Sequence, residues 1–308
     1  MFSVIFPGQG SQLVGMGKEF FDKYDLVKDL FKEADSALGV NLSKIILEGP
    51  KEELDLTINT QPAIFLVSYS IFNVIKKEFN IDLNKANFFA GHSLGEYSAL
   101  ACAGYLDFSE TLKILKLRGE AMQNAVPKGE GGMLAILGST FENVEDILIK
   151  NEDKFKAQIA NDNSEGQIVV SGRLNELGKL SNFFREKGVK NILLPVSAPF
   201  HCWLMKKATN EMSKHLNDLN FLSGKNSIIS NVTAEQILEN NQIKDLLIRQ
   251  IENKVRWRES VLNMINAGVN QFIEIGPGKV LSGLIKRIDR KINSSSINSL
   301  DDIENINI

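Results

Sequence analysis

The chain has 308 residues, which exceeds the ~100–200 residues usual for one domain, so we expect one large domain or a domain with a second lobe. Hydrophobic residues make up 43% of the chain and charged residues 24%, and these ordinary values exclude disordered and collagen-like architectures. A formal net charge of −3 argues against a general nucleic-acid-binding protein.

The two cysteines, Cys102 and Cys202, are too few for a disulfide framework, and no His/Cys spacing indicates a metal site. We therefore expect a reduced, cytoplasmic protein without a metal cofactor. The start of the sequence lacks the features of a secretory signal, and no run of ~18 apolar residues is uninterrupted. No membrane span is expected.

The first part of the chain predicts strands that alternate with helices. An apolar run at residues 4–6 predicts a buried strand that ends in the glycine-rich turn of residues 7–12. Apolar residues at helical spacing predict a helix from Pro62 onward, with Asn59 or Thr60 as its cap. A strand at residues 87–90 leads through a turn directly into a helix of small residues that reaches Gly104.

Residues 127–197 have a different order of elements. We expect a strand at 133–137, a helix at 141–149, strands at 157–160 and 167–170, a helix at 176–186 and a strand at 191–196. This βαββαβ order is that of a ferredoxin-like unit. The first pattern resumes with a strand at 227–232, helices at 243–251 and 257–266, and a strand at 272–275. The predicted fold class is therefore α/β with a small inserted α+β lobe, and the polar residues from 293 on are expected to be frayed.

Residues 91–95, GHSLG, match the pattern G-x-S-x-G, in which the glycines permit a sharp turn from strand to helix that projects the serine hydroxyl. The pattern also arises by chance, as a glycine-rich turn with an incidental serine. Here the strand and helix that the motif requires are predicted on either side of it. We therefore interpret Ser93 as a nucleophile.

A serine nucleophile needs a base, and the chain has three histidines. His92 adjoins Ser93, so its side chain is expected to point away from the hydroxyl. His215 lies in a polar helical stretch and is interpreted as a surface residue. His201 follows a predicted strand in a loop, where catalytic groups are often found, and it is the best candidate for the base.

The predicted helix at 110–123 carries a charge where an apolar residue is expected. At 100° per residue, Arg118 falls in the middle of the apolar face. A buried guanidinium without a partner costs several kcal/mol, so Arg118 is expected to have a carboxylate or phosphate partner. The partner is either an internal carboxylate or a ligand group, unless the side chain reaches solvent.

The glycine-rich turns match neither of the two common phosphate-binding motifs. Leu13 stands where the third glycine of G-x-G-x-x-G would be, and Met16-Gly17 replaces the Lys-Ser/Thr that ends a P-loop.

The chain carries a series of motifs in order: residues 6–12 (FPGQGSQ), 91–100 (GHSLGEYSAL), Arg118 with Met122, 199–201 (PFH), Arg249-Gln250, 255–257 (VRW) and 274–279 (EIGPGK). Taken together, these motifs resemble the malonyl-CoA:acyl carrier protein transacylases of bacterial fatty-acid synthesis. The resemblance spans nearly the whole chain. It implies an α/β-hydrolase-like large subdomain, residues 1–126 and 198–308, with an inserted ferredoxin-like subdomain, residues 127–197.

The resemblance implies a ping-pong acyl transfer in which Ser93, activated by His201, takes malonyl from malonyl-CoA and gives it to holo acyl carrier protein. By similarity, the main-chain N–H groups of Gln9 and Leu94 form an oxyanion hole, and a carbonyl at Gln250 orients the histidine in place of an aspartate.

The same resemblance assigns four substrate-binding positions. Arg118 pairs with the malonyl carboxylate, Met122 and Phe200 crowd the α-carbon, and Asn163 lies near the pantetheine arm. Two departures affect local loop geometry: Cys202 stands where serine is common, and Glu165 replaces a frequent proline.

Two alternatives stay open at the level of sequence. A serine hydrolase would share Ser93 and His201 but would have no reason to bury Arg118. A catalytically silent acyl-CoA-binding protein would tolerate the loss of Ser93. A monomer is expected, with no cofactor, no nucleic acid and no membrane as partner.

Overall fold

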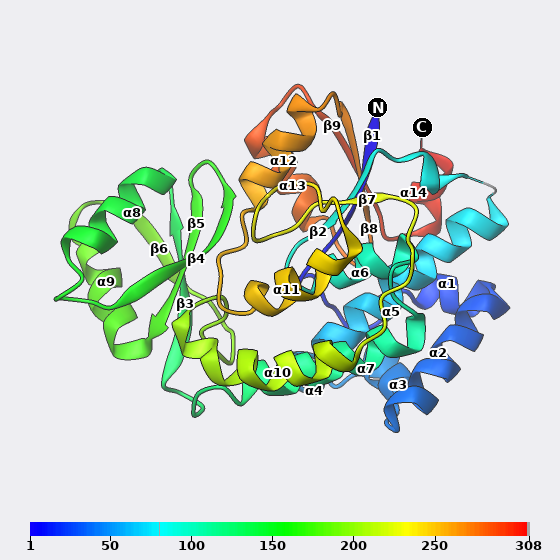
Figure 1. Cartoon of the computed structure of the whole chain (residues 1–308), viewed down its shortest axis with the longest axis horizontal. Coiled ribbons are helices and arrows are strands. Elements are labelled where there is room, and N and C mark those ends of the chain that lie inside the picture. The colour runs from blue at the N-terminus through cyan, green and yellow to red at the C-terminus, as the bar shows by residue number, and fades with distance from the viewer. Residues whose placement is uncertain (80, 307–308) are drawn as a thin grey trace.

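Two sheets with helices around them make up the protein (Figure 1), as described by a computed structural model for residues 1–79 and 81–306. The first part contains β1 (Phe2–Phe6), α1 (Lys18–Lys23), α2 (Asp25–Leu38), α3 (Leu42–Glu48), α4 (Lys51–Leu54), α5 (Thr57–Glu78), β2 (Phe88–Gly91), α6 (Leu94–Cys102) and α7 (Phe108–Gln123). The middle part contains β3 (Gly131–Leu137), α8 (Phe141–Lys150), β4 (Ala157–Ser164), β5 (Gln167–Arg173), α9 (Leu174–Glu186) and β6 (Lys190–Leu193). The last part contains α10 (Lys206–Asp218), β7 (Ser227–Ile228), α11 (Asn240–Gln250), α12 (Trp257–Asn266), β8 (Gln271–Ile275), α13 (Val280–Ile288), β9 (Asn293–Ile297) and α14 (Leu300–Glu304).

The larger sheet is parallel. Among the described residues it has five strands in the order β7-β2-β1-β8-β9. All of β1 is buried because helices cover both faces of the sheet, as is usual for a parallel sheet. The side chains of Val4 and Phe6 join one hydrophobic cluster and that of Ile5 joins another, which follows from the two-residue repeat of a strand.

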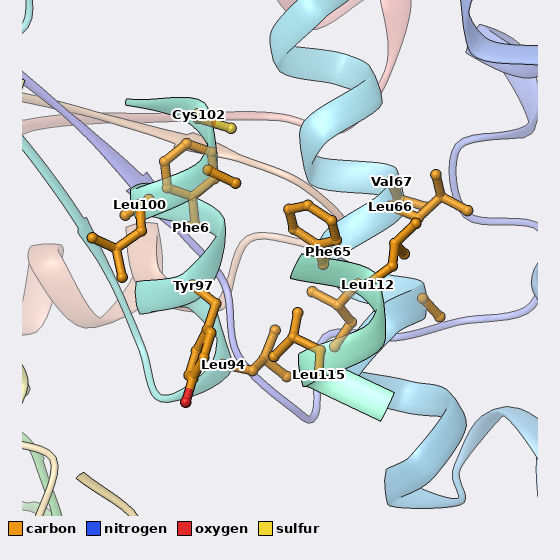
Figure 2. Packing of buried hydrophobic residues seen from close by; sticks show 14 of the residues in the cluster. Phe6, Phe65, Leu66, Val67, Leu94, Tyr97, Leu100, Cys102, Leu112 and Leu115 are labelled. Carbon is orange, nitrogen blue, oxygen red and sulfur yellow. The ribbon is translucent and has the colours of Figure 1, made fainter. Parts of the chain in front are cut away.

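The main core lies between this sheet and α5, α6 and α7, where Phe6, Phe65, Leu94 and Leu112 pack together (Figure 2). The helix α5 is long and apolar enough to cross a membrane by length and composition alone, but 78% of its most apolar window is buried inside the protein. That burial makes it a core helix.

The start of α5 differs from the prediction. The helix begins at Thr57, so neither Asn59 nor Thr60 is its cap, and Pro62 lies in its second turn. The main-chain N–H of Thr57 donates to Oε1 of Gln123, at the end of α7, over 2.9 Å. This tertiary contact satisfies a first-turn donor and lets the helix begin earlier than its own sequence indicates.

The smaller sheet is antiparallel, with strand order β4-β5-β3-β6 among the described residues. Together with α8 and α9 it forms a lobe that stands to one side of the larger sheet, green in Figure 1. The lobe has its own hydrophobic cluster, which includes Leu134, Val170 and Phe184. The predicted element order of residues 127–197 is confirmed here.

The end of the chain is ordered, so the prediction of fraying from residue 293 is wrong for the residues described. β9 pairs with β8 in parallel from Asn293 to Ile297, and Ile297 is fully buried. Ser299 then caps α14 in a reciprocal arrangement with Asp302. A serine-rich strand can occupy a sheet edge because main-chain hydrogen bonds supply its pairing.

β7 is shorter than predicted. The strand covers Ser227–Ile228, whereas residues 227–232 were expected to be a strand. The chain turns after Ile229, because the N–H of Ala234 donates to the carbonyl of Ser230 over 2.9 Å. This turn brings Asn231 toward the end of β2.

The two sheets are joined at β4. The N–H of Val255, in the loop before α12, donates to Ala160 O over 2.8 Å, and the N–H of Asp162 donates to Val255 O over 3.0 Å. The Arg258 side chain in α12 pairs with the fully buried Asp162 carboxylate. These contacts therefore hold the smaller lobe in a fixed position against the larger one.

Candidate active site

Ser93 lies on the turn between β2 and α6, with φ 55° and ψ −109°. Positive φ is rare for a residue with a side chain. The turn is tight enough to require both glycines of the motif, since a Cβ on Gly91 would lie 2.0 Å from the carbonyl carbon of Gly95. A Cβ on Gly95 would lie 2.3 Å from the carbonyl oxygen of Phe6. The backbone therefore has the geometry of the strained strand-to-helix turn that exposes a serine.

His201 is brought to this serine from another part of the chain. Its Nε2 lies 2.8 Å from Ser93 Oγ, and its Nδ1 lies 2.8 Å from the main-chain oxygen of Gln250. A carbonyl can only accept, so we assign the proton to Nδ1, which leaves the lone pair of Nε2 for the hydroxyl. Burial, with the Arg118 charge as second cause, lowers the pKa of His201 to about 3, so the ring is neutral at neutral pH.

Arg118 is 1% exposed and its guanidinium faces the same hydroxyl. Its Nη2 donates to Ser93 Oγ over 3.1 Å and to Gln250 Oε1 over 2.9 Å, and its Nη1 donates to Gln61 Oε1 over 2.8 Å. These partners are neutral, and Arg118 forms no ion pair with a carboxylate of the described residues. Of the three expectations for Arg118, a side chain that reaches solvent is wrong because Arg118 is buried, and an internal carboxylate partner is absent from the described part of the chain, which leaves the ligand group as a prediction.

The side chains of Asn231 and Gln250 hold this turn in place. Asn231 was not identified from sequence, and Gln250 was expected to act only through its main-chain carbonyl. Asn231 Oδ1 accepts from the main-chain N–H of Ser93 at 2.7 Å, and Asn231 Nδ2 donates to Gly91 O at 2.7 Å. The side chain of Gln250 donates from Nε2 to Ser93 O over 3.1 Å. The N–H of Ser93 is therefore already used within the protein, whereas Leu94 begins α6, where main-chain N–H groups point outward.

A cavity of about 140 Å³ opens beside Ser93 between the two lobes. Gln9, Leu94, Met122, Phe200 and Asn163, which the resemblance assigned to the site, all line it. Gln250 reaches the site through its contacts with His201 and Arg118. In the described part of the chain, no group of three or more His, Cys, Asp or Glu side chains is arranged to hold a metal ion. The other lining residues are Gln61, His92, Ser93, Arg118, Met133, Asn161, Val169, Leu194, Val196 and His201.

His92 points toward the smaller lobe. Its Nε2 lies 2.8 Å from Asn163 Oδ1 and 3.4 Å from Asn161 Nδ2. Its ring also packs against Trp257, with centroids 5.8 Å apart. Because β4 is fixed to the larger lobe, His92 and these asparagines form one wall of the cavity.

Three polar residues beside the site were not identified from sequence: Gln61, Asn231 and Glu96. Glu96 is fully buried in α6, among apolar and small residues. A charge on an otherwise apolar helix, the feature that distinguishes Arg118, also distinguishes Glu96 in the sequence. Gln61 and Asn231 carry no such signal because uncharged amides are common in helices and turns.

Comparison with known proteins agrees with this geometry. Residues 3–301 match the model of the acyl transferase domain family. The malonyl CoA-acyl carrier protein transacylase of Bacillus subtilis (strain 168) is 43% identical over 302 residues, which covers 97% of this chain and 94% of that protein. The chain belongs to this family of transacylases.

Solved structures of transacylases have the same fold. The acyl-carrier-protein S-malonyltransferase of Bartonella henselae superposes with a TM-score of 0.95 at 41% identity, covering 98% of this chain and 97% of that chain. A malonyl-transacylase solved in complex with its holo type II PKS acyl-carrier protein gives a TM-score of 0.94 at 36% identity, with 98% and 97% of the two chains covered.

Proposed function

We propose that this acyltransferase moves malonyl from malonyl-CoA to the phosphopantetheine thiol of holo acyl carrier protein by a ping-pong mechanism, and so supplies malonyl-ACP for fatty-acid biosynthesis. The observation that carries the proposal is the position of Ser93 Oγ, 2.8 Å from His201 Nε2 and 3.1 Å from Arg118 Nη2. A hydroxyl, a neutral imidazole and a cation that has no carboxylate partner among the described residues thus meet at one atom. The names of the transacylase relatives support the same substrates.

In the first half-reaction, Ser93 Oγ attacks the thioester carbon of malonyl-CoA and its proton passes to His201 Nε2. The main-chain N–H groups of Gln9 and Leu94 would stabilise the oxyanion, each contributing about 3–4 kcal/mol. The C–S bond then breaks, and the proton moves from His201 to the CoA sulfur. The product is a malonyl ester on Ser93.

The second half-reaction reverses these steps with a different thiol. The phosphopantetheine S–H gives its proton to His201 Nε2, and the sulfur attacks the ester carbon of malonyl-Ser93. The C–O bond breaks, and the proton returns to Ser93 Oγ. His201 therefore serves as base and acid in turn, and the carbonyl of Gln250 holds its ring in place throughout, 2.8 Å from Nδ1.

Arg118 would select the acyl group. The thioester carbon and the free carboxylate of malonyl are separated by one methylene, so a carboxylate on Arg118 places the thioester carbon beside Ser93. An acetyl group would leave the guanidinium without this partner, and such a loss discriminates by about 10⁴ in a well-built site. Met122 and Phe200, both buried in the wall of the cavity, would crowd a methyl-branched malonyl group.

The architecture that goes with this function is an α/β-hydrolase-like large subdomain, residues 1–126 and 198–308, with a ferredoxin-like subdomain inserted at residues 127–197. Residues 80, 307 and 308 lie outside the described residues. The strand order β4-β5-β3-β6 supports the second description. Asn163 would contact the pantetheine arm from this lobe. We further propose a cytoplasmic monomer that needs no cofactor and has no nucleic-acid or membrane partner.

The test is intact-mass spectrometry of the enzyme mixed with malonyl-CoA. The expected result is one malonyl adduct on the wild-type protein that disappears when holo acyl carrier protein is added, and no adduct on Ser93→Ala. Transfer by Ser93→Ala should fall by about 10³-fold or more.

Radiolabelled malonyl-CoA provides the control against hydrolysis. Label should reach acyl carrier protein faster than it appears as free malonate. The opposite order would favour a serine hydrolase, and an undiminished adduct on Ser93→Ala would refute the assignment of the nucleophile.

A further inference from the structure

A second charged group, Glu96, is completely buried behind the active site. Its Oε2 accepts from Gln250 Nε2 at 2.7 Å and from the main-chain N–H of Asn231 at 3.1 Å. Its Oε1 has no hydrogen-bond partner among the described residues. Burying a carboxylate costs free energy, so a buried carboxylate that takes no part in the proposed reaction needs a physical reason for its presence.

The contacts of Gln250 supply that reason. Its Nε2 faces acceptors: Glu96 Oε2 at 2.7 Å, Ser93 O at 3.1 Å and Asn231 Oδ1 at 3.4 Å. Its Oε1 accepts from Arg118 Nη2 at 2.9 Å. If the amide were turned over, its NH₂ would meet the guanidinium and its oxygen would meet the carboxylate. Glu96 and Arg118 thus determine the orientation of this amide from opposite ends.

The amide in turn determines where Arg118 lies. The same Nη2 that donates to Gln250 Oε1 donates to Ser93 Oγ over 3.1 Å. A correctly oriented Gln250 therefore holds the guanidinium next to the nucleophile, and a reversed or mobile amide would release it. The chain of contacts runs from Glu96 through Gln250 to Arg118 without a gap.

We propose that Glu96 is a positioning residue for acyl-group selection: by orienting the Gln250 amide, it holds Arg118 where the carboxylate of a malonyl thioester binds. This inference rests on the proposed function, because it requires that Arg118 binds the substrate carboxylate. Glu96 itself touches neither Ser93 Oγ nor the substrate.

The environment of Glu96 indicates that its acceptor oxygen matters more than its charge. Burial raises the pKa of Glu96 to about 7, against the hydrogen bonds from Asn231 and Gln250 and the charge of Arg118. The group is therefore partly protonated at neutral pH. A proton on Oε1 leaves Oε2 free to accept from Gln250, so the orientation of the amide is kept in both forms.

Two substitutions of nearly equal shape distinguish the role of the acceptor oxygen of Glu96 from the role of its charge. Glu96→Gln keeps an acceptor for Gln250, whereas Glu96→Met fills the same space without one. The kcat/KM values for malonyl-CoA and acetyl-CoA are measured for both variants and for the wild type. We expect Glu96→Met to lower the malonyl-to-acetyl ratio by about tenfold or more, with a raised KM for malonyl-CoA, and Glu96→Gln to stay within about threefold of wild type.

Ser98→Ala is the matched control, because Ser98 is fully buried on the same helix and its hydroxyl has no partner among the described residues. It should leave the ratio unchanged. If Glu96→Met does not fold, Glu96→Asp tests the same point, because its shortened carboxylate keeps the charge but no longer reaches Gln250. It too should lower the ratio.

Equal losses for both substrates in Glu96→Met, or no loss, would overturn the proposal, as would a Glu96→Gln ratio as low as that of Glu96→Met. Failure of the proposed function is distinguishable, since it would appear in the wild type as an absence of malonyl transfer to acyl carrier protein.

Discussion

Two arginines in this protein lie in different surroundings. Arg258, between the lobes, donates from Nε to both carboxylate oxygens of Asp162, at 3.0 and 3.1 Å. Arg118, at the bottom of the cavity, is more deeply buried and has neutral partners. An arginine that already has a carboxylate serves the structure, whereas one that is buried among amides and hydroxyls keeps its capacity to bind an anion. The difference separates the part of the molecule that holds the lobes together from the part that we propose selects the substrate.

The largest effect that tests this comparison is expected from Arg118→Ala. Removing the guanidinium should lower the malonyl-to-acetyl ratio of kcat/KM by ~10³–10⁴, because the substrate carboxylate loses its partner. Steady-state kinetics with the two thioesters measures it. The loss of unfolding free energy should be about 1–3 kcal/mol, because the buried amide oxygens of Gln61 and Gln250 lose a donor but no ion pair with a carboxylate of the described residues is broken. Equal losses for malonyl and acetyl would remove the distinction between the two arginines.

Arg258→Ala should have the opposite profile. It leaves the fully buried Asp162 carboxylate without its cation, which costs about 3 kcal/mol of unfolding free energy, while the malonyl-to-acetyl ratio stays near that of the wild type. Denaturant unfolding measures the loss. In the double variant Asp162→Asn/Arg258→Ala, part of the stability should return, because the carboxylate of this pair is no longer buried without its cation. A changed ratio in Arg258→Ala with unchanged stability would contradict the structural role.

The smallest effect is expected in the pH dependence of stability, through the titration of Glu96. Burial raises the pKa of Glu96 from 4.5 to about 7, so the folded state binds more protons than the unfolded state between these values. This contribution is present below pH 4.5 and is lost as the pH rises through about 7. Glu96→Gln removes the titration, so its Tm relative to wild type should rise by a few degrees across that window. A difference in Tm that is constant with pH would contradict the raised pKa of Glu96.

Part of the site could be identified from the sequence because its signals are local. Ser93 has a motif that requires two glycines, and both are required sterically here. Arg118 was found because it breaks the period of an apolar helix, and it is buried. Gln250, Gln9 and Asn163 carry no signal of this kind, and they came from the resemblance to a family.

Other features depended on contacts between distant parts of the chain. The first turn of α5 begins at Thr57 because Gln123 binds its N–H, and residues 293–297 form a strand because β8 offers an edge. Neither effect is visible in the segment itself. The early end of β7 likewise places Asn231 next to the turn that carries Ser93.

The sequence by itself determined the alternation of strands and helices, the order of elements in residues 127–197, the turn at Ser93 and the burial of Arg118, because each element or turn depends on residues close to one another in the chain. The tertiary structure alone decided which partners those residues have. His201 reaches Ser93 across 108 positions and Gln250 reaches Arg118 across 132, and no periodicity within a segment encodes such distances. They follow from how the helices and loops pack around the parallel sheet, where groups far apart in the chain meet at the ends of its strands.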